Sequence, residues 1–184
     1  MENTPIKDIL YGEINHITES RILQEISSKN YSKIINEILT RCIPIISKLD
    51  GDSFKIFGTF AESMMHYLLT NALIPSQRKI TIKNIDLDIT IPDSRTLDTS
   101  PKDAIILVFA KTSEQDTITN YLKKLQKIQP IKENIWIISK SKLDIPCKTY
   151  ELESKERLST ILDDINDFLL SRPQSKFRIF KTKL

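Results

Sequence analysis

A continuous apolar run near the middle of the chain restricts the folds that this sequence can adopt. The run extends from Ala104 to Ala110, and polar residues flank it on both sides. A strand without a polar face of its own fits a position that is buried on both faces of a sheet. A second, shorter run of this kind extends from Ile135 to Ile138. The sequence therefore predicts an α/β fold in which these two strands are central.

Helices are predicted wherever apolar residues recur every three or four positions. Pro44 should bend or split the second of these helices, because proline removes an internal hydrogen bond. The start of the third helix is ambiguous, since Phe54 to Phe57 would also fit a short strand. The predicted helices span residues 6–26, 32–49, 54–72, 114–128 and 158–169.

Residues 80–91 alternate between apolar and polar positions and are rich in β-branched side chains, which predicts one bent strand or two short ones. A polar connection follows over residues 92–102. Together with the two apolar runs, these elements give a core in the order α, β, β, β, α, β, with helices added at both ends.

The length of 184 residues suits a single domain, 1–184, with one full hydrophobic core. The order of the elements divides this domain into four parts. These are an N-terminal helical extension (1–50), the αβββαβ core (54–140), a C-terminal helix (155–171) and a basic tail (172–184).

The overall charge does not by itself indicate a nucleic-acid partner. The chain has 27 basic and 24 acidic residues, a net charge of +3. The tail from Arg172 to Leu184 contains five basic residues and no acidic one, so it would either contact phosphate groups or remain a solvated terminus. With only 3 glycines, the sequence contains no glycine-rich phosphate loop.

No apolar run approaches the roughly 18 residues that a membrane span needs, and the N-terminus lacks the pattern of a signal peptide. We therefore expect a cytoplasmic protein that does not insert into membranes. Cys42 and Cys147 have no partners at the spacing of a zinc site or a disulfide framework, which favours buried or idle thiols.

Two acidic residues on the predicted strand over 80–91 carry the strongest chemical signal. Asp86 and Asp88 are two positions apart, so both side chains should project to one face of the strand. Their carboxylates repel each other unless solvent screens them or a cation lies between them. A hard divalent ion such as Mg²⁺ suits such a pair, although a water-facing edge strand would also explain it.

Two further features accompany this acidic pair. Lys111 ends the apolar run, where its ammonium group could orient an attacking water or stabilise charge on a phosphate, or merely mark the return of the strand to solvent. Gly58 and Glu62 are four residues apart on one helical face, so the glycine would leave room beside a carboxylate that points toward the sheet.

In combination, these residues resemble the PD-(D/E)XK nuclease-like superfamily, whose core is restriction-endonuclease-like, over roughly residues 54–140. The resemblance implies an αβββαβ fold with a mixed central sheet and a nuclease that depends on Mg²⁺ or Mn²⁺. It further implies Asp88 as a metal ligand, Lys111 as the catalytic lysine, Glu62 and Asp86 as auxiliary acids that also bind metal, DNA as the partner, and a homodimer.

One position departs from that pattern. The residue two before the lysine is Phe109, where the superfamily has Glu, Asp or Gln. Either Glu62 or Asp86 would substitute for the missing acid, or the scaffold would bind nucleic acid without cutting it. The sequence leaves both outcomes open.

Two other classes of protein remain as alternatives. If Phe54 to Phe57 forms a strand, Gly58-Thr59 followed by Asp86 and Asp88 resembles a nucleotidyltransferase site, in which a Gly-Thr turn holds a triphosphate. The gap of 28 residues between Gly58 and Asp86 is long for that arrangement. The other alternative is a non-catalytic module that binds nucleic acid or protein.

Overall fold

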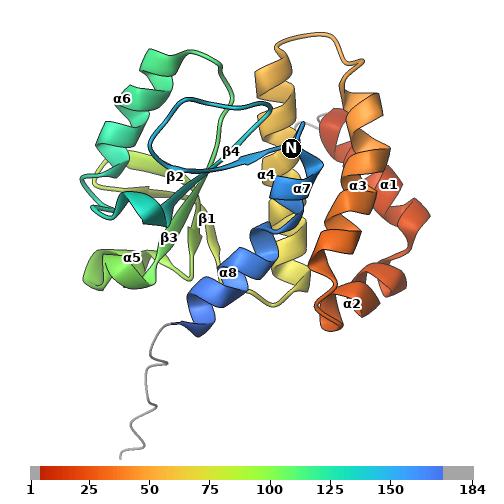
Figure 1. The fold of residues 1–184 in the computed structure, drawn as a ribbon, viewed down its shortest axis with the longest axis horizontal. Helices are drawn as coiled ribbons and strands as arrows, with labels where there is room; N and C mark the ends of the chain where they lie inside the picture. Colours follow the sequence, from red (N-terminus) through yellow and green to blue (C-terminus); the bar gives the residue numbers. More distant parts are fainter. Residues whose placement is uncertain (1–4, 172–184) are drawn as a thin grey trace, which may run out of the picture.

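A five-stranded mixed sheet lies between two layers of helices in the computed structural model, which describes residues 5–171 (Figure 1). The strands follow one another across the sheet in sequence order. The first three are antiparallel, and the third, fourth and fifth are parallel. They are β1 (Gln77–Ile82), β2 (Ile85–Ile91), β3 (Ile105–Phe109), β4 (Ile135–Ser139) and β5 (Lys148–Glu151).

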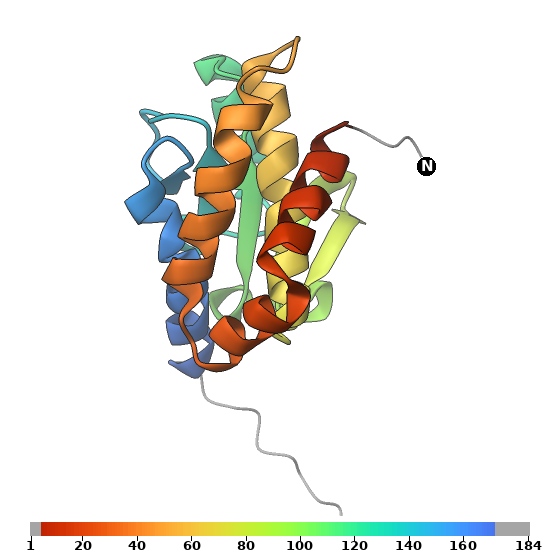
Figure 2. The ribbon, with the colours of Figure 1, turned by 90° about the vertical axis from the view of Figure 1, so that its right-hand side faces the viewer.

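Helices cover both faces of this sheet. The long helix α4 packs on β3 and β4, and α1 and α3 cover α4 as an outer layer, which is in the foreground of Figure 2. The opposite face is covered by α5 and α6 (Figure 1). The helices are α1 (Pro5–Ile17), α2 (Glu19–Ser27), α3 (Tyr31–Ile46), α4 (Ser53–Asn71), α5 (Ser94–Thr99), α6 (Gln115–Leu125), α7 (Lys155–Ser159) and α8 (Ile161–Leu170), with short 3₁₀ turns η1 (Pro101–Asp103) and η2 (Lys132–Asn134).

The order α4, β1, β2, β3, α6, β4 confirms the predicted αβββαβ core with its mixed sheet. Both apolar runs form the expected buried strands, because every residue of β3 and β4 is buried. The residues of the predicted N-terminal extension share one hydrophobic core with α4 and the sheet. The predicted basic tail over 172–184 lies outside the described residues.

Several element boundaries differ from the predictions. The predicted helix over 6–26 is two helices, because Thr18 adopts a φ of 75° that interrupts the first. Pro44 does not split α3, which continues to Ile46. The pattern over 80–91 is a hairpin of β1 and β2, whose tight turn has positive φ at Lys83 and Asn84. The predicted connection over 92–102 contains α5 and η1.

The ambiguous segment from Phe54 to Phe57 is helical. The carboxylate of Asp52 accepts hydrogen bonds from the backbone N–H groups of Phe54 and Lys55 and thereby starts α4 at Ser53. The nucleotidyltransferase interpretation required a strand at this point, so its premise is wrong. Gly58-Thr59 lies within a helix and forms no phosphate-binding turn.

Among residues 5–171, none of the helices combines the length and apolar character needed to cross a membrane.

Candidate active site

Strand β2 separates from β3 at Asp88. The paired residues end at Ile89, which lies opposite Leu107. Beyond that pair, the backbone N–H of Phe109 donates a 2.9 Å hydrogen bond to Oδ2 of Asp88. A side-chain carboxylate thus takes the place of a backbone carbonyl from the neighbouring strand, which holds Asp88 at the point where the two strands part.

Helix α4 approaches the end of β3 closely because residue 58 is glycine. A Cβ atom at Gly58 would lie 2.7 Å from the carbonyl oxygen of Ala110 and 2.9 Å from Cγ of Lys111. One turn further along α4, Oε2 of Glu62 accepts a 2.8 Å hydrogen bond from Nζ of Lys111. The predicted role of the glycine, to leave room beside a carboxylate that faces the sheet, agrees with this geometry.

Two cations of β1 complete the surroundings of Glu62. A guanidinium nitrogen of Arg78 lies 3.0 Å from Oε1 of Glu62, and Nζ of Lys79 lies 3.7 Å from the same oxygen. The side chain of Glu62 is only 5% exposed. Burial alone would raise its pKa, but hydrogen bonds from Lys111 and Arg78, with the charges of Lys111 and Lys79, hold the pKa of Glu62 below its usual value.

The pKa of Asp88 is shifted in the opposite direction, above its usual value. Burial raises the pKa of Asp88, and the Phe109 N–H and the charge of Lys111 offset only part of this rise. Keeping Asp88 ionised in this buried position therefore lowers the stability of the folded protein.

Replacing Asp88 with asparagine is expected to raise the free energy of unfolding at neutral pH. The amide oxygen keeps an acceptor for the Phe109 N–H, whereas the cost of a buried negative charge disappears. Because the folded pKa is raised, this gain is present above that pKa and vanishes as the pH falls through it. Urea unfolding of both proteins at pH 7.5 and at about pH 4 measures the difference, and a less stable Asp88→Asn variant at pH 7.5 would contradict this expectation.

A cavity of about 220 Å³ opens beside Asp88, between the end of β3 and α6. The hydroxyl of Tyr121 in its wall donates a 2.6 Å hydrogen bond to the carbonyl oxygen of Asp86. Asp88 and Lys111 therefore face one cavity that is open to solvent on one side. The lining residues are Asp88, Val108, Phe109, Ala110, Lys111, Thr112, Thr117, Ile118 and Tyr121.

The predicted set of three carboxylates does not gather at this cavity. The carboxylate of Asp86 is exposed and accepts a 2.6 Å hydrogen bond from the hydroxyl of Thr81 in β1. The regular alternation of side chains along β2 breaks at Asp88. Leu87 packs on the α6 side of the sheet, whereas Ile89, two residues later, packs on the α4 side. Within the described chain, no three acidic, histidine or cysteine side chains lie close enough to hold a metal ion together.

Phe109 provides no ligand in place of the acid. Its side chain is 3% exposed and packs in the hydrophobic core on the α4 side of the sheet. The structure thus brings Asp88, Glu62 and Lys111 together and leaves Asp86 at the surface. It adds Arg78 and Lys79, which could not be predicted because nothing in the pattern of β1 shows which helix its cations face.

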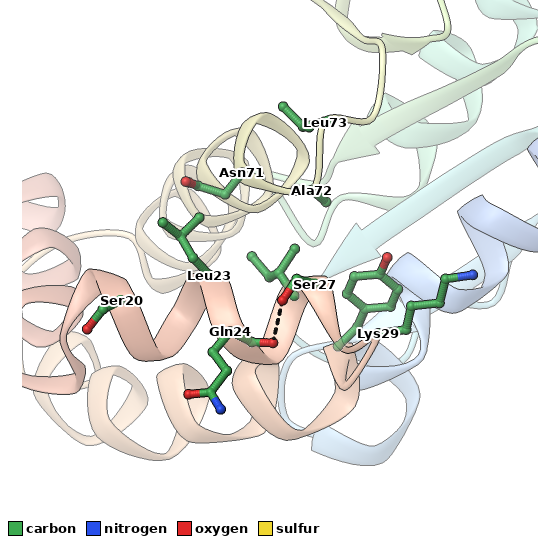
Figure 3. A pocket seen from close by; sticks show the side chains of 10 residues that line it. Ser20, Leu23, Gln24, Ser27, Lys29, Asn71, Ala72 and Leu73 are labelled. Atoms are coloured by element: carbon green, nitrogen blue, oxygen red, sulfur yellow. Dashed lines mark hydrogen bonds between the residues drawn. The ribbon is translucent and has the colours of Figure 1, made fainter.

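A larger hollow of about 640 Å³ lies elsewhere, between α2 and the end of α4 (Figure 3). Leu23 and Leu73 line it together with amides and hydroxyl groups, and Lys29 is its one charged lining residue. Although it is larger, none of its lining residues has a carboxylate, and it offers no acidic group beside Lys29. The smaller cavity, which Asp88 and Lys111 line, is therefore the better candidate for an active site.

A solved structure with a similar fold is the restriction endonuclease PspGI in complex with its substrate DNA. The alignment covers 92% of this chain and 95% of that chain, with a TM-score of 0.58 and 13% sequence identity. The fold is restriction-endonuclease-like. No protein-family model matches the sequence of this restriction-endonuclease-like chain, and no curated protein matches it.

The carboxylates of Asp88 and Glu62 fit a divalent ion only in part. Mg²⁺ is often held by one or two carboxylates, with water and substrate phosphate as the other ligands. Asp88 has one oxygen without a hydrogen-bond donor among residues 5–171, whereas cations engage both oxygens of Glu62. These carboxylate oxygens therefore suit an ion whose other ligands are water and phosphate, and not an ion that is coordinated by protein ligands alone.

Proposed function

We propose that the protein acts on nucleic acid and hydrolyses its phosphodiester bonds with the help of Mg²⁺ or Mn²⁺. The observation that carries this proposal is that Asp88 of β2 and Lys111 at the end of β3 line one cavity, and that Glu62 of α4 binds the ammonium of Lys111. The similar fold of an endonuclease solved with substrate DNA supports the choice of nucleic acid as the partner.

Each residue has a role that follows from its surroundings. Asp88, fixed by the Phe109 N–H, would hold the ion through its other oxygen, whereas Glu62, whose two oxygens accept hydrogen bonds from Lys111 and Arg78, would keep Lys111 in position. The ion would supply Lewis-acid stabilisation of the phosphate and a more acidic water. The ammonium of Lys111, kept at the cavity by Glu62, would stabilise negative charge that develops on the phosphate oxygens during the reaction.

The test compares native protein with Asp88→Asn and Asp86→Asn on plasmid DNA and on RNA, with Mg²⁺ or Mn²⁺. We expect cleavage by the native protein, loss of cleavage in Asp88→Asn, and retention in Asp86→Asn, because only Asp88 lines the cavity. Calorimetry of metal binding to the same three proteins provides a readout that needs no substrate. Cleavage that persists in Asp88→Asn would refute the proposed site.

A second candidate function is nucleic-acid binding without hydrolysis. It is favoured by the buried side chain of Phe109 and by the three cations that already neutralise Glu62. In that case the native protein would bind DNA or RNA equally well with and without divalent ions, and no product would form. The homodimer implied by the family resemblance stays a prediction, which analytical ultracentrifugation of the native protein would test.

A further inference from the structure

Lys79 has an unusual backbone for a residue in the middle of a strand. Its φ is 51°, in the left-handed region that is unfavourable for residues with a Cβ atom. Lys83 and Asn84 also have positive φ, but they form the hairpin turn, for which that conformation is required. No turn explains Lys79, and an unexplained backbone outlier beside a reactive centre suggests a functional cause.

The strained backbone changes where two successive side chains point. Neighbouring residues of a regular strand project to opposite faces. Here Arg78 and Lys79 both reach Oε1 of Glu62, at 3.0 and 3.7 Å. In the hairpin register, the residues flanking Lys79 pair with those flanking Asp88, so Lys79 lies across from Asp88. The conformation therefore brings a second cation of β1 to Glu62, from the strand position opposite Asp88.

The fold does not need this extra charge to neutralise Glu62. Lys111 and Arg78 already donate hydrogen bonds to its two oxygens, whereas Lys79 has a contact of 3.7 Å without a hydrogen bond. The side chain of Lys79 is 68% exposed, compared with 39% for Lys111 and 28% for Arg78. All three cations contact Glu62, and the most exposed of them, Lys79, makes the longest contact.

We propose that Lys79 contacts a phosphate group of bound nucleic acid next to the Asp88 centre, and that the left-handed backbone at Lys79 is retained for this contact. The inference rests on the proposed function, since it assumes a nucleic-acid ligand. The exposed ammonium group of Lys79 would contact a phosphate at this position without any rearrangement of the fold. A contact of this kind strengthens binding without reading sequence.

The test uses two lysines of one hairpin as a matched pair. Lys79 and Lys83 have nearly the same φ, 51° and 50°, and similar exposure, 68% and 67%. Glycine relieves the same backbone conformation at both positions, so Lys79→Gly and Lys83→Gly should each keep or raise the melting temperature. Binding of fluorescent DNA and RNA is measured for both variants against salt, with Ca²⁺ in place of Mg²⁺ to allow binding without turnover.

We expect Lys79→Gly to weaken binding about fivefold to tenfold at about 0.1 M salt and to make the salt dependence shallower by about 0.9 in the log–log slope for duplex DNA. Lys83→Gly should leave the slope unchanged, and Lys79→Arg should retain it because the charge remains.

Three results would overturn the inference. An unchanged slope in Lys79→Gly would do so and leave the proposed function intact. An equal change in Lys83→Gly would show a diffuse effect of surface charge. If the native protein binds neither DNA nor RNA, the proposed function fails together with this inference.

Discussion

Replacing Gly58 with alanine should lower the free energy of unfolding by about 2 to 3 kcal/mol, near the upper end of the usual cost of overpacking. The added methyl group would lie 2.7 Å from the carbonyl oxygen of Ala110. That oxygen belongs to the main chain at the end of β3 and cannot move aside as a flexible side chain would. Helix α4 must therefore shift from the sheet, and we expect the Glu62–Lys111 contact and any hydrolytic activity to be lost with it.

Gly12 provides a matched control, because it also lies inside a helix, α1. A Cβ atom there would meet nothing within 4 Å. Gly12→Ala should therefore raise the free energy of unfolding by about 0.5 to 1 kcal/mol, the ordinary gain of alanine over glycine in a helix. Urea unfolding of the two variants gives both values, and equal effects at the two sites would disprove the close approach of α4 to β3.

Replacing Glu62 with alanine should cost about 2 to 3 kcal/mol of stability, below the range for a fully buried ion pair because Lys111 and Arg78 remain partly exposed. Its removal leaves three cations near one another without the carboxylate that joins them. Glu37 is the control, since it also contacts two arginines, Arg21 and Arg41, but near the surface. Glu37→Ala should cost less than about 1 kcal/mol.

The dependence on pH separates charge from packing at Glu62. Its pKa is lower in the folded protein than the usual value of 4.5. The stability that Glu62 contributes is therefore present above about pH 4.5 and is lost as the pH falls through the lowered pKa. Glu62→Gln should flatten this acidic part of the stability profile. An unchanged profile in Glu62→Gln would mean that the three cations do not stabilise the carboxylate.

The core of the fold could be predicted from the sequence because its signals are local. The runs at Ala104 to Ala110 and Ile135 to Ile138 are apolar on both faces, which only a covered sheet accommodates. Strand β5 was missed because its four residues include a charge at each end. The break at Thr18 was missed because a threonine gives no warning of a positive φ.

The candidate site could be predicted only in part, for a related reason. Gly58, Glu62, Asp88 and Lys111 keep a recognisable spacing, and the structure brings these residues together. Asp86 was expected beside Asp88, but that expectation assumed regular alternation, which fails where β2 changes face. Lys79 could not be predicted, because its contact with Glu62 accompanies a backbone conformation that lysine rarely adopts.

The hydrogen bond from Phe109 to Asp88 gives this molecule a spectroscopic probe of its own. The amide proton of Phe109 points directly at the Asp88 carboxylate, so its NMR resonance responds to protonation of that group and to any cation that approaches it. The resonance can be followed in the free protein, without substrate and with no label beyond ¹⁵N. This one backbone amide thus reports the charge of the Asp88 carboxylate.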